Sequence, residues 1–312
     1  MNALGVKFRP HVKTTKCLDV VRAQAAAGAQ GITVSTLKEA EAFFAAGIKD
    51  ILYAVGIVAA KLPRAMALRR RGCDLKLVVD NVAAAQAVVD YVHAHGERCA
   101  VRIEVDTDGH RSGITPEQDA LLEVGRILKD GRIDVGGVMT HAGSSYDLND
   151  HTALATEQLE GVTEVRAGVY VFFDLVMHNV GVCAMDEIAL SALITVIGHQ
   201  PDKGWVIVDA GWMAMSRDRG TAKQAHDYGY GQPCALDGTP FDGLMLIGAN
   251  QEHGILAASD GSVRNDLAER FPVGTKLRIL PKHACVTGAQ FPEYQAVSSR
   301  GAVQTWGRFH GW

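Results

Sequence analysis

Short apolar, β-branched runs alternate with alanine-rich stretches over the first 180 residues of the chain. The apolar runs have the length of buried strands, and the alanine-rich stretches have the length and composition of helices. The strand-like runs occupy residues 6–14, 31–36, 50–55, 74–80, 99–107, 135–144 and 161–173. The helix-like stretches occupy residues 17–27, 37–46, 59–71, 82–95 and 116–129. Regular alternation of this kind predicts a parallel sheet covered by helices.

Seven strand-like runs in succession predict a (β/α)8-type TIM barrel from which one βα unit is missing in this sequence. The pattern changes near residue 180, beyond which glycine and proline turns separate the apolar runs. These later runs occupy residues 187–198, 204–211, 241–250, 275–281 and 301–308. They predict an antiparallel β domain. We therefore expect a barrel over residues 1–180 and a C-terminal β domain over residues 181–312.

The composition is typical of a globular protein that acts on small molecules. The chain has 312 residues, of which 47% are hydrophobic and 21% charged, so it can bury a large core. A formal net charge of −4 leaves no basic surplus for nucleic acid or an anionic membrane. No stretch approaches the ~20 apolar residues of a membrane span, and the N-terminal segment has no apolar core of signal-peptide length. The six cysteines form no CxxC pair, so we expect reduced thiols and a cytoplasmic protein.

The segment RPHVKTTK gathers cationic side chains within the first predicted strand. Alternation along an extended strand places Arg9, His11, Lys13 and Thr15 on one face. Such a face does not fill a barrel interior, because burying unpaired charge is costly. A lysine that burial and neighbouring cations keep uncharged can form a Schiff base with a carbonyl group. On the pattern alone, an exposed edge with solvated cations is an equal alternative.

The segment KHACVT contains a pair of metal-binding residue types. His283 and Cys285 are two residues apart, so they face the same way on a strand. Imidazole and thiolate together suit zinc or a similar divalent ion. On its own, however, the spacing is more typical of a buried thiol beside a hydrogen-bonded histidine. A complete site would also need a third ligand, or substrate and water.

Three further motifs bring polar groups to the carboxyl ends of predicted strands, where barrel enzymes hold their catalytic groups. DTDGHRSG places Arg111 there, and MTHAGSSY places His141 and Tyr146. EVRAGVY closes the seventh strand with Gly168, a turn whose N–H groups suit a phosphate. Each motif also has a plainer interpretation: a solvated loop arginine, a hydrogen-bonded core histidine, and a glycine that only reverses the chain.

Taken in order, these motifs resemble the metal-activated branch of the fold-type III, alanine-racemase-like pyridoxal-phosphate enzymes. The likeness extends from about residue 8 to the C-terminus. It rests on RPHVKTTK, ITVSTLKEAEAFFAAGI, DTDGHRSG, HAGSSY, VRAGVYVFFD, DAGWMAMSRD, NQEHG and HACVTGAQ. That branch includes D-threonine aldolase, D-serine dehydratase and D-threo-3-hydroxyaspartate dehydratase. The last is the most similar, in the barrel motifs and in the ending VQTWGRFHGW.

The resemblance implies that Lys13 binds pyridoxal 5'-phosphate covalently and is the catalytic base. It implies that His283 and Cys285 bind a divalent metal: zinc, manganese, cobalt or magnesium. The other implied cofactor contacts are Arg111, His141, Tyr146, Gly168, Val169 and Tyr170. The implied reaction removes water from a D-3-hydroxy amino acid, with D-threo-3-hydroxyaspartate giving oxaloacetate and ammonia. The alternatives are aldol cleavage to glycine and an aldehyde, dehydration of D-serine, and a non-catalytic pyridoxal-phosphate-binding protein.

The sequence departs from the family in two places. Family members carry an extra strand and helix before RPHVK. They also carry a helix and a strand between HAGSSY and GVTEVRAG, where only residues 147–160 stand here, and that strand ends in a phosphate-binding loop. Loss of this unit leaves strand edges unpaired and removes phosphate-binding N–H groups, so we expect that part of the chain is missing from this sequence. The resemblance also implies a homodimer.

Overall fold

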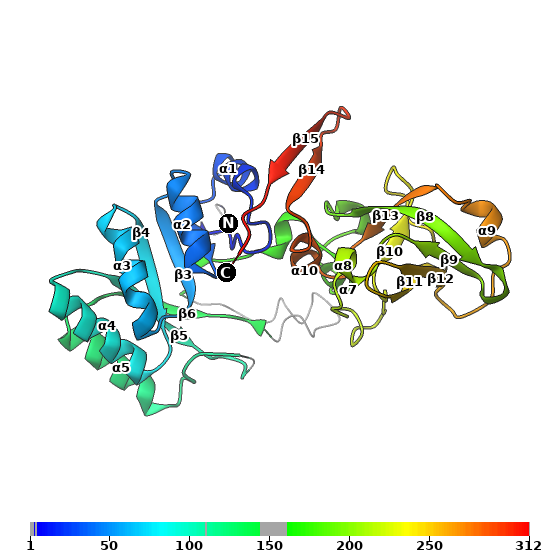
Figure 1. Ribbon diagram of the computed structural model, residues 1–312. Coiled ribbons are helices and arrows are strands. Elements are labelled where there is room, and N and C mark those ends of the chain that lie inside the picture. Colours follow the sequence, from blue (N-terminus) through cyan, green and yellow to red (C-terminus); the bar gives the residue numbers. More distant parts are fainter. Residues whose placement is uncertain (1–2, 4, 110, 144–160, 312) are drawn as a thin grey trace. The chain divides into compact units, whose positions relative to one another are not determined.

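The computed structural model describes residues 3, 5–109, 111–143 and 161–311 and divides them into two compact units (Figure 1). The described part of the first unit comprises residues up to 143 together with 161–168 and 293–311. The second unit comprises residues 169–292. The domain boundary at residue 180 stays a prediction, and the compact units differ from it chiefly because the last twenty or so residues pack with the first unit. None of the described helices has the length and apolar character needed to cross a membrane.

Parallel strands form the framework of the first unit. Its main sheet has the order β2-β3-β4-β5-β6, and β1 pairs in parallel with β7. A bridge between His11 and Thr33 joins the two groups. The strands are β1 (Lys7–Phe8), β2 (Ile32–Val34), β3 (Asp50–Gly56), β4 (Asp74–Val79), β5 (Ala100–Val105), β6 (Asp134–Thr140) and β7 (Glu164–Val165). All seven predicted strands are therefore present, although no ladder joins β6 to β7 among the described residues. The missing unit stays a prediction.

Helices follow the strands of the first unit close to the predicted positions. They are α1 (Leu18–Ala26), α2 (Leu37–Ala45), α3 (Leu62–Arg70) after the short 3-10 helix η2 (Ala59–Lys61), α4 (Val82–His95) and α5 (Asp119–Asp130). Local capping explains two of the starts. Thr36 accepts a hydrogen bond from the N–H of Glu39 at 3.0 Å, and Asn81 accepts one from Ala84 at 2.8 Å. Apolar side chains of β2–β5 and of the helices form one continuous core.

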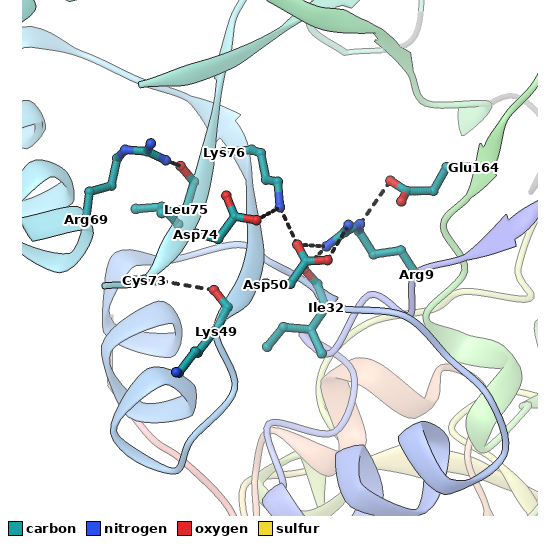
Figure 2. A network of polar contacts seen from close by, with 10 residues as sticks. All are labelled: Arg9, Ile32, Lys49, Asp50, Arg69, Cys73, Asp74, Leu75, Lys76 and Glu164. Atoms are coloured by element: carbon teal, nitrogen blue, oxygen red, sulfur yellow. Dashed lines mark hydrogen bonds and ion pairs between the residues drawn. The ribbon is translucent and has the colours of Figure 1, made fainter. Parts of the chain in front are cut away.

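Arg9 occupies a charged network within the first unit (Figure 2). Its side chain is buried and donates to Asp50 at 2.8 and 3.0 Å, and its Nε atom lies 2.9 Å from Glu164. Lys76 binds the same Asp50 carboxylate and also Asp74. Arg9 is therefore a buried cation whose charge is fully compensated by carboxylates.

The prediction that Arg9, His11, Lys13 and Thr15 share one face is wrong. The strand ends early, and residues 12–15 form a turn instead of continuing the alternation. Within this turn Lys13 is exposed, whereas Thr15 is buried. The turn separates Lys13 from the Arg9 network and gives each residue its own surroundings.

An antiparallel sheet forms most of the second unit, as predicted. Its strand order is β10-β13-β8-β9-β12-β11. The strands are β8 (Ala192–Gln200), β9 (Trp205–Val208), β10 (Gln232–Cys234), β11 (Leu244–Ala249), β12 (Gly254–Ala258) and β13 (Lys276–Leu280). The short helices are η4 (Val169–Val171), α7 (Leu175–Asn179), η5 (Met185–Glu187), η6 (Pro201–Lys203), α8 (Trp212–Met215), α9 (Leu267–Arg270) and α10 (Ala284–Gly288). A second core of buried apolar residues lies against this sheet.

The end of the chain returns to the turn that contains Lys13. A hairpin of β14 (Glu293–Val297) and β15 (Val303–Gly307) belongs to the first unit. At its base, Tyr294 and Arg308 both donate hydrogen bonds to the carbonyl oxygen of Thr15, at 3.0 and 2.9 Å. Phe309 packs edge-on against Phe43, with 4.9 Å between the ring centroids. The hairpin base therefore fixes the end of the Lys13 turn.

Candidate active site

A cavity of about 460 Å³ in the first unit brings together Lys13, Arg111 and His141. Each of these residues follows the carboxyl end of a different strand: Lys13 follows β1, Arg111 follows β5 and His141 follows β6. Ser35, Asp80 and Arg166, which also line the cavity, follow β2, β4 and β7. The cavity thus lies where parallel barrels place their reactive groups.

Two histidines in this cavity are held in the neutral form. Burial and the nearby cations Lys13 and Arg166 lower the pKa of His11 well below its usual value. Burial, together with Arg111 and Lys13, lowers the pKa of His141 to about 4. The Nδ1 atom of His11 accepts a long hydrogen bond, 3.5 Å, from the N–H of Lys13. The two neutral imidazoles can therefore contact a ligand without adding positive charge to the cavity.

Arginines supply the positive charge of the cavity. Arg111 lies 3.4 Å from the buried carboxylate of Glu104, whose pKa is raised by burial although Arg111 opposes the shift. Arg166 donates to the carbonyl oxygen of Thr140 at 2.9 Å. Sequence reasoning missed Arg166 as a cavity residue, although it stands inside the EVRAGVY motif, two residues before Gly168.

The remaining predicted cofactor contacts have different surroundings. A Cβ atom on Gly168 would lie 3.0 Å from both the carbonyl oxygen of His11 and the hydroxyl of Thr14. Gly168 therefore allows the chain after β7 to lie directly against the Lys13 turn. Val169 and Tyr170 begin η4 in the second unit, and Tyr146 lies outside the described residues.

The chemistry of the cavity fits pyridoxal phosphate. An exposed lysine amine provides the group that binds the aldehyde, and two arginines provide the charge that a phosphate and a phenolate oxygen require. Gly168 packs closely against the Lys13 turn. A larger residue at position 168 would force the backbone or a side chain of that turn to shift.

The second predicted feature, the His283–Cys285 pair, lies within the second unit. The prediction that both residues are on a strand is wrong: β13 ends at Leu280, His283 precedes α10, and Cys285 is in its first turn. Their side chains are nevertheless close, since the thiol of Cys285 is a hydrogen-bond partner of His283. Cys285 is the one partly exposed cysteine, whereas the other five are buried.

Charged residues from three segments surround this pair. The Nδ1 atom of His283 lies 2.7 Å from a carboxylate oxygen of Asp218, and this hydrogen bond holds the pKa of Asp218 below its usual value. Asp174 accepts a hydrogen bond from the N–H of Ala284 at 2.8 Å. Lys282 is fully buried, which lowers its pKa to about 8, and it donates to the carbonyl oxygens of Met215 and Ser216.

The donor set fits a divalent metal ion. With Nδ1 of His283 facing Asp218, the Nε2 atom remains for coordination, and the sulfur of Cys285 is close to the ring. Among the described residues there is no group of three or more histidine, cysteine, aspartate or glutamate side chains that could hold a metal. The predicted completion of the coordination by a third ligand, or by substrate and water, stays a prediction.

Comparison with known proteins gives the family. Residues 1–178 match the family “Alanine racemase, N-terminal domain”, and residues 189–297 match the “Putative serine dehydratase domain”. The chain is 59% identical to the D-threo-3-hydroxyaspartate dehydratase of Delftia sp. (strain HT23), over 100% of this chain and 92% of that protein. The chain belongs to the alanine-racemase-like family. The predicted resemblance to this family is confirmed.

Solved structures agree with the family in fold. The Delftia enzyme superposes on this alanine-racemase-like chain with a TM-score of 0.97, covering 100% of this chain and 92% of that one at 58% identity. A cysteine-to-alanine variant of a D-threo-3-hydroxyaspartate dehydratase, solved in a metal-free form, gives a TM-score of 0.96 over the same shares and at the same identity. The predicted barrel followed by a C-terminal β domain is thereby confirmed as the fold class.

More distant family members have related names. The chain is 25% identical to the D-serine dehydratase of Dictyostelium discoideum, over 96% of this chain and 89% of that protein. It is also 25% identical to the 3-hydroxy-D-aspartate aldolase of Paracoccus denitrificans (strain Pd 1222), over 97% of this chain and 84% of that protein.

Proposed function

We propose that this chain is a pyridoxal-phosphate- and divalent-metal-dependent dehydratase that converts D-threo-3-hydroxyaspartate to oxaloacetate and ammonia. The observation that carries this proposal is the 59% identity, over the whole chain, with a dehydratase of that name. The cavity around Lys13 and the His283–Cys285 pair support it, because they offer the two kinds of chemistry that the reaction needs.

The cofactor supplies an electron sink for the charge left at Cα, and the metal supplies Lewis-acid help for departure of the β-hydroxyl group. The residues of this chain do the rest. The amine of Lys13 would take the proton from Cα, and Arg111 and the neutral imidazole of His141 would hold the cofactor, because all three residues line the cavity. Elimination of water leaves an enamine, which hydrolyses to a keto acid and ammonia.

We assign the remaining roles in the same proposal. Further cofactor contacts are Tyr146, Gly168, Val169 and Tyr170, and the metal ligands are His283 and Cys285. The metal-free cysteine variant of a D-threo-3-hydroxyaspartate dehydratase supports a metal role for a cysteine in this family. We also propose that the protein is a cytoplasmic homodimer.

A substrate screen tests the function. The purified protein, with cofactor, is incubated with the D and L forms of 3-hydroxyaspartate, serine and threonine, with and without Zn²⁺ or Mn²⁺. Ammonia and oxaloacetate released from D-threo-3-hydroxyaspartate in a metal-dependent manner support the proposal. Glycine and an aldehyde without ammonia would instead assign an aldolase, the activity named for the Paracoccus relative.

A further inference from the structure

Three charged side chains bind His283 or the segments next to the His283–Cys285 pair. We propose that Asp218, Lys282 and Asp174 are positioning residues that fix this pair in one geometry for a divalent metal ion. The inference rests on the proposed function, which assigns the metal to His283 and Cys285. None of the three residues is among the ligands of that assignment.

Asp218 determines which nitrogen of His283 is available. Its carboxylate lies 2.7 Å from Nδ1, so the proton of the neutral ring stays on Nδ1 and the lone pair stays on Nε2. Without this carboxylate the ring can rotate, and the proton can occupy Nε2 instead. Asp218 therefore selects the tautomer that can bind a metal.

Lys282 connects His283 to the loop that carries Asp218. It immediately precedes His283, yet its side chain is 0% exposed and donates to the carbonyl oxygens of Met215 and Ser216. Ser216 has a positive φ of 71°, which is strained for a residue with a side chain, and its hydroxyl accepts the N–H of Asp218 at 3.0 Å. The ammonium group thus holds the strained turn from which Asp218 projects.

Asp174 fixes the backbone between His283 and Cys285. One oxygen of its buried carboxylate accepts the N–H of Ala284 at 2.8 Å, and the other accepts the N–H of Met177 at 3.0 Å. Ala284 stands between His283 and Cys285, so this bond fixes the backbone that sets their spacing. A helix of only five residues has little stability by itself. The hydrogen bond from Ala284 to Asp174, 110 residues away, stabilises its first residue.

This arrangement predicts a loss of metal affinity that does not depend on unfolding. Asp218→Asn nearly preserves the size of the side chain, but the new amide can donate to Nδ1 of His283 and so favour the tautomer with the proton on Nε2. Loss of such an outer contact weakens metal binding by roughly 10–100-fold. Lys282→Met removes the ammonium while keeping an unbranched side chain, and we expect a loss in the same range.

The test is a titration of Zn²⁺ into the purified full chain with bound cofactor, followed by calorimetry. Asp218→Asn and Lys282→Met are compared with the wild type and with two controls on exposed residues of the same unit, Asp242→Asn and Lys276→Met. Melting of the metal-free proteins reports folding, and cofactor absorbance reports the first unit. The visible spectrum of the Co²⁺-substituted proteins reports coordination geometry.

The expected result is a Kd for Zn²⁺ raised about 10–100-fold in both variants, with an altered Co²⁺ spectrum, unchanged cofactor absorbance and normal controls. Wild-type Kd values in both variants would overturn the inference. The inference would also be overturned if the lower affinity for Zn²⁺ were accompanied by a lower melting temperature of the metal-free variants, because the role of the residues would then be structural only. If wild type binds no Zn²⁺, the inference and the metal part of the proposed function fall together. Tight, variant-sensitive binding without dehydratase activity would overturn the proposed function alone.

Discussion

The guanidinium group of Arg9 lies between the carboxylates of Asp50 and Glu164, 2.8 and 2.9 Å from them. The arginine side chain is buried, whereas that of Asp50 remains 41% exposed. Because Arg9 is on the segment after β1, Asp50 begins β3 and Glu164 begins β7, one side chain ties together three parts of the first unit.

Replacing Arg9 with Met should therefore destabilise the protein. Glu164 would lose its cation and Asp50 would keep only Lys76, so the free energy of unfolding should fall by about 1–3 kcal/mol. Urea unfolding measures the change. Arg22→Met is the matched control, because the Arg22 side chain is 64% exposed and should contribute less than about 0.5 kcal/mol. Equal effects of the two substitutions would contradict a structural role for the Arg9 network.

Substitution of Lys13 by Ala should abolish both catalysis and covalent attachment of the cofactor. The amine is the proposed base and the proposed attachment point, so activity and the absorbance of the attached cofactor should disappear together. Lys38→Ala, on an exposed position of α2, should retain both. A Lys13→Ala protein that keeps wild-type turnover would exclude the assignment.

Removal of the metal should abolish activity reversibly. Dialysis against a strong chelator should stop ammonia release, and added Zn²⁺ or Mn²⁺ should restore it, because hydroxide leaves poorly without a Lewis acid. Cys285→Ala should not respond to added metal. A Cys234→Ala control removes a fully buried thiol of β10 and should remain responsive. Activity that survives complete metal removal would contradict the proposed reaction.

Introducing a methyl group at Gly168 should disturb the Lys13 turn. The new Cβ would meet the carbonyl oxygen of His11 and the hydroxyl of Thr14 at 3.0 Å, so Gly168→Ala should cost about 1–2 kcal/mol and weaken cofactor binding. Cofactor titration and urea unfolding measure both effects. Gly125→Ala, in α5 with no heavy atom within 4 Å, should instead be neutral or slightly stabilising.

Acidification should destabilise the first unit between about pH 6.5 and pH 4. Burial and the cations Arg111, Lys13 and Arg166 lower the pKa of His141 to about 4. The unfolded chain binds this proton more readily, so the full stability is present above about pH 6.5 and decreases as the pH falls toward 4. His141→Gln should flatten this decrease in urea unfolding. The exposed His310→Gln should leave it unchanged.

Local sequence pattern predicted the regular elements well. Helix α4 coincides with the predicted residues 82–95, because its cap at Asn81 and its terminal Gly96 are both local signals. The prediction that Arg9 and Lys13 share one face of a strand was wrong. Strand alternation cannot reveal the turn over residues 12–15, which is held by contacts with residues 294 and 308.

The sequence motifs contained the residues of the candidate site, but they did not predict how those residues are arranged in space. The helix α10 begins inside KHACVT at Ala284, whose N–H is bound by Asp174 from 110 residues away, and no periodicity within six residues can show this. The quoted motifs already contained Asp174, Asp218, Lys282 and Arg166, but their roles depend on partners far along the chain. The signal available in the sequence was the presence of these charged residues inside largely apolar motifs.

The contact between Arg308 and Thr15 spans 293 residues of sequence. During synthesis the ribosome makes Arg308 long after Thr15, so the turn that presents the amine cannot reach its final form until residue 308 has been added. A nascent or prematurely terminated chain would thus contain the reactive lysine without its support. We therefore expect stable attachment of the cofactor to Lys13 to follow synthesis of the Arg308 segment.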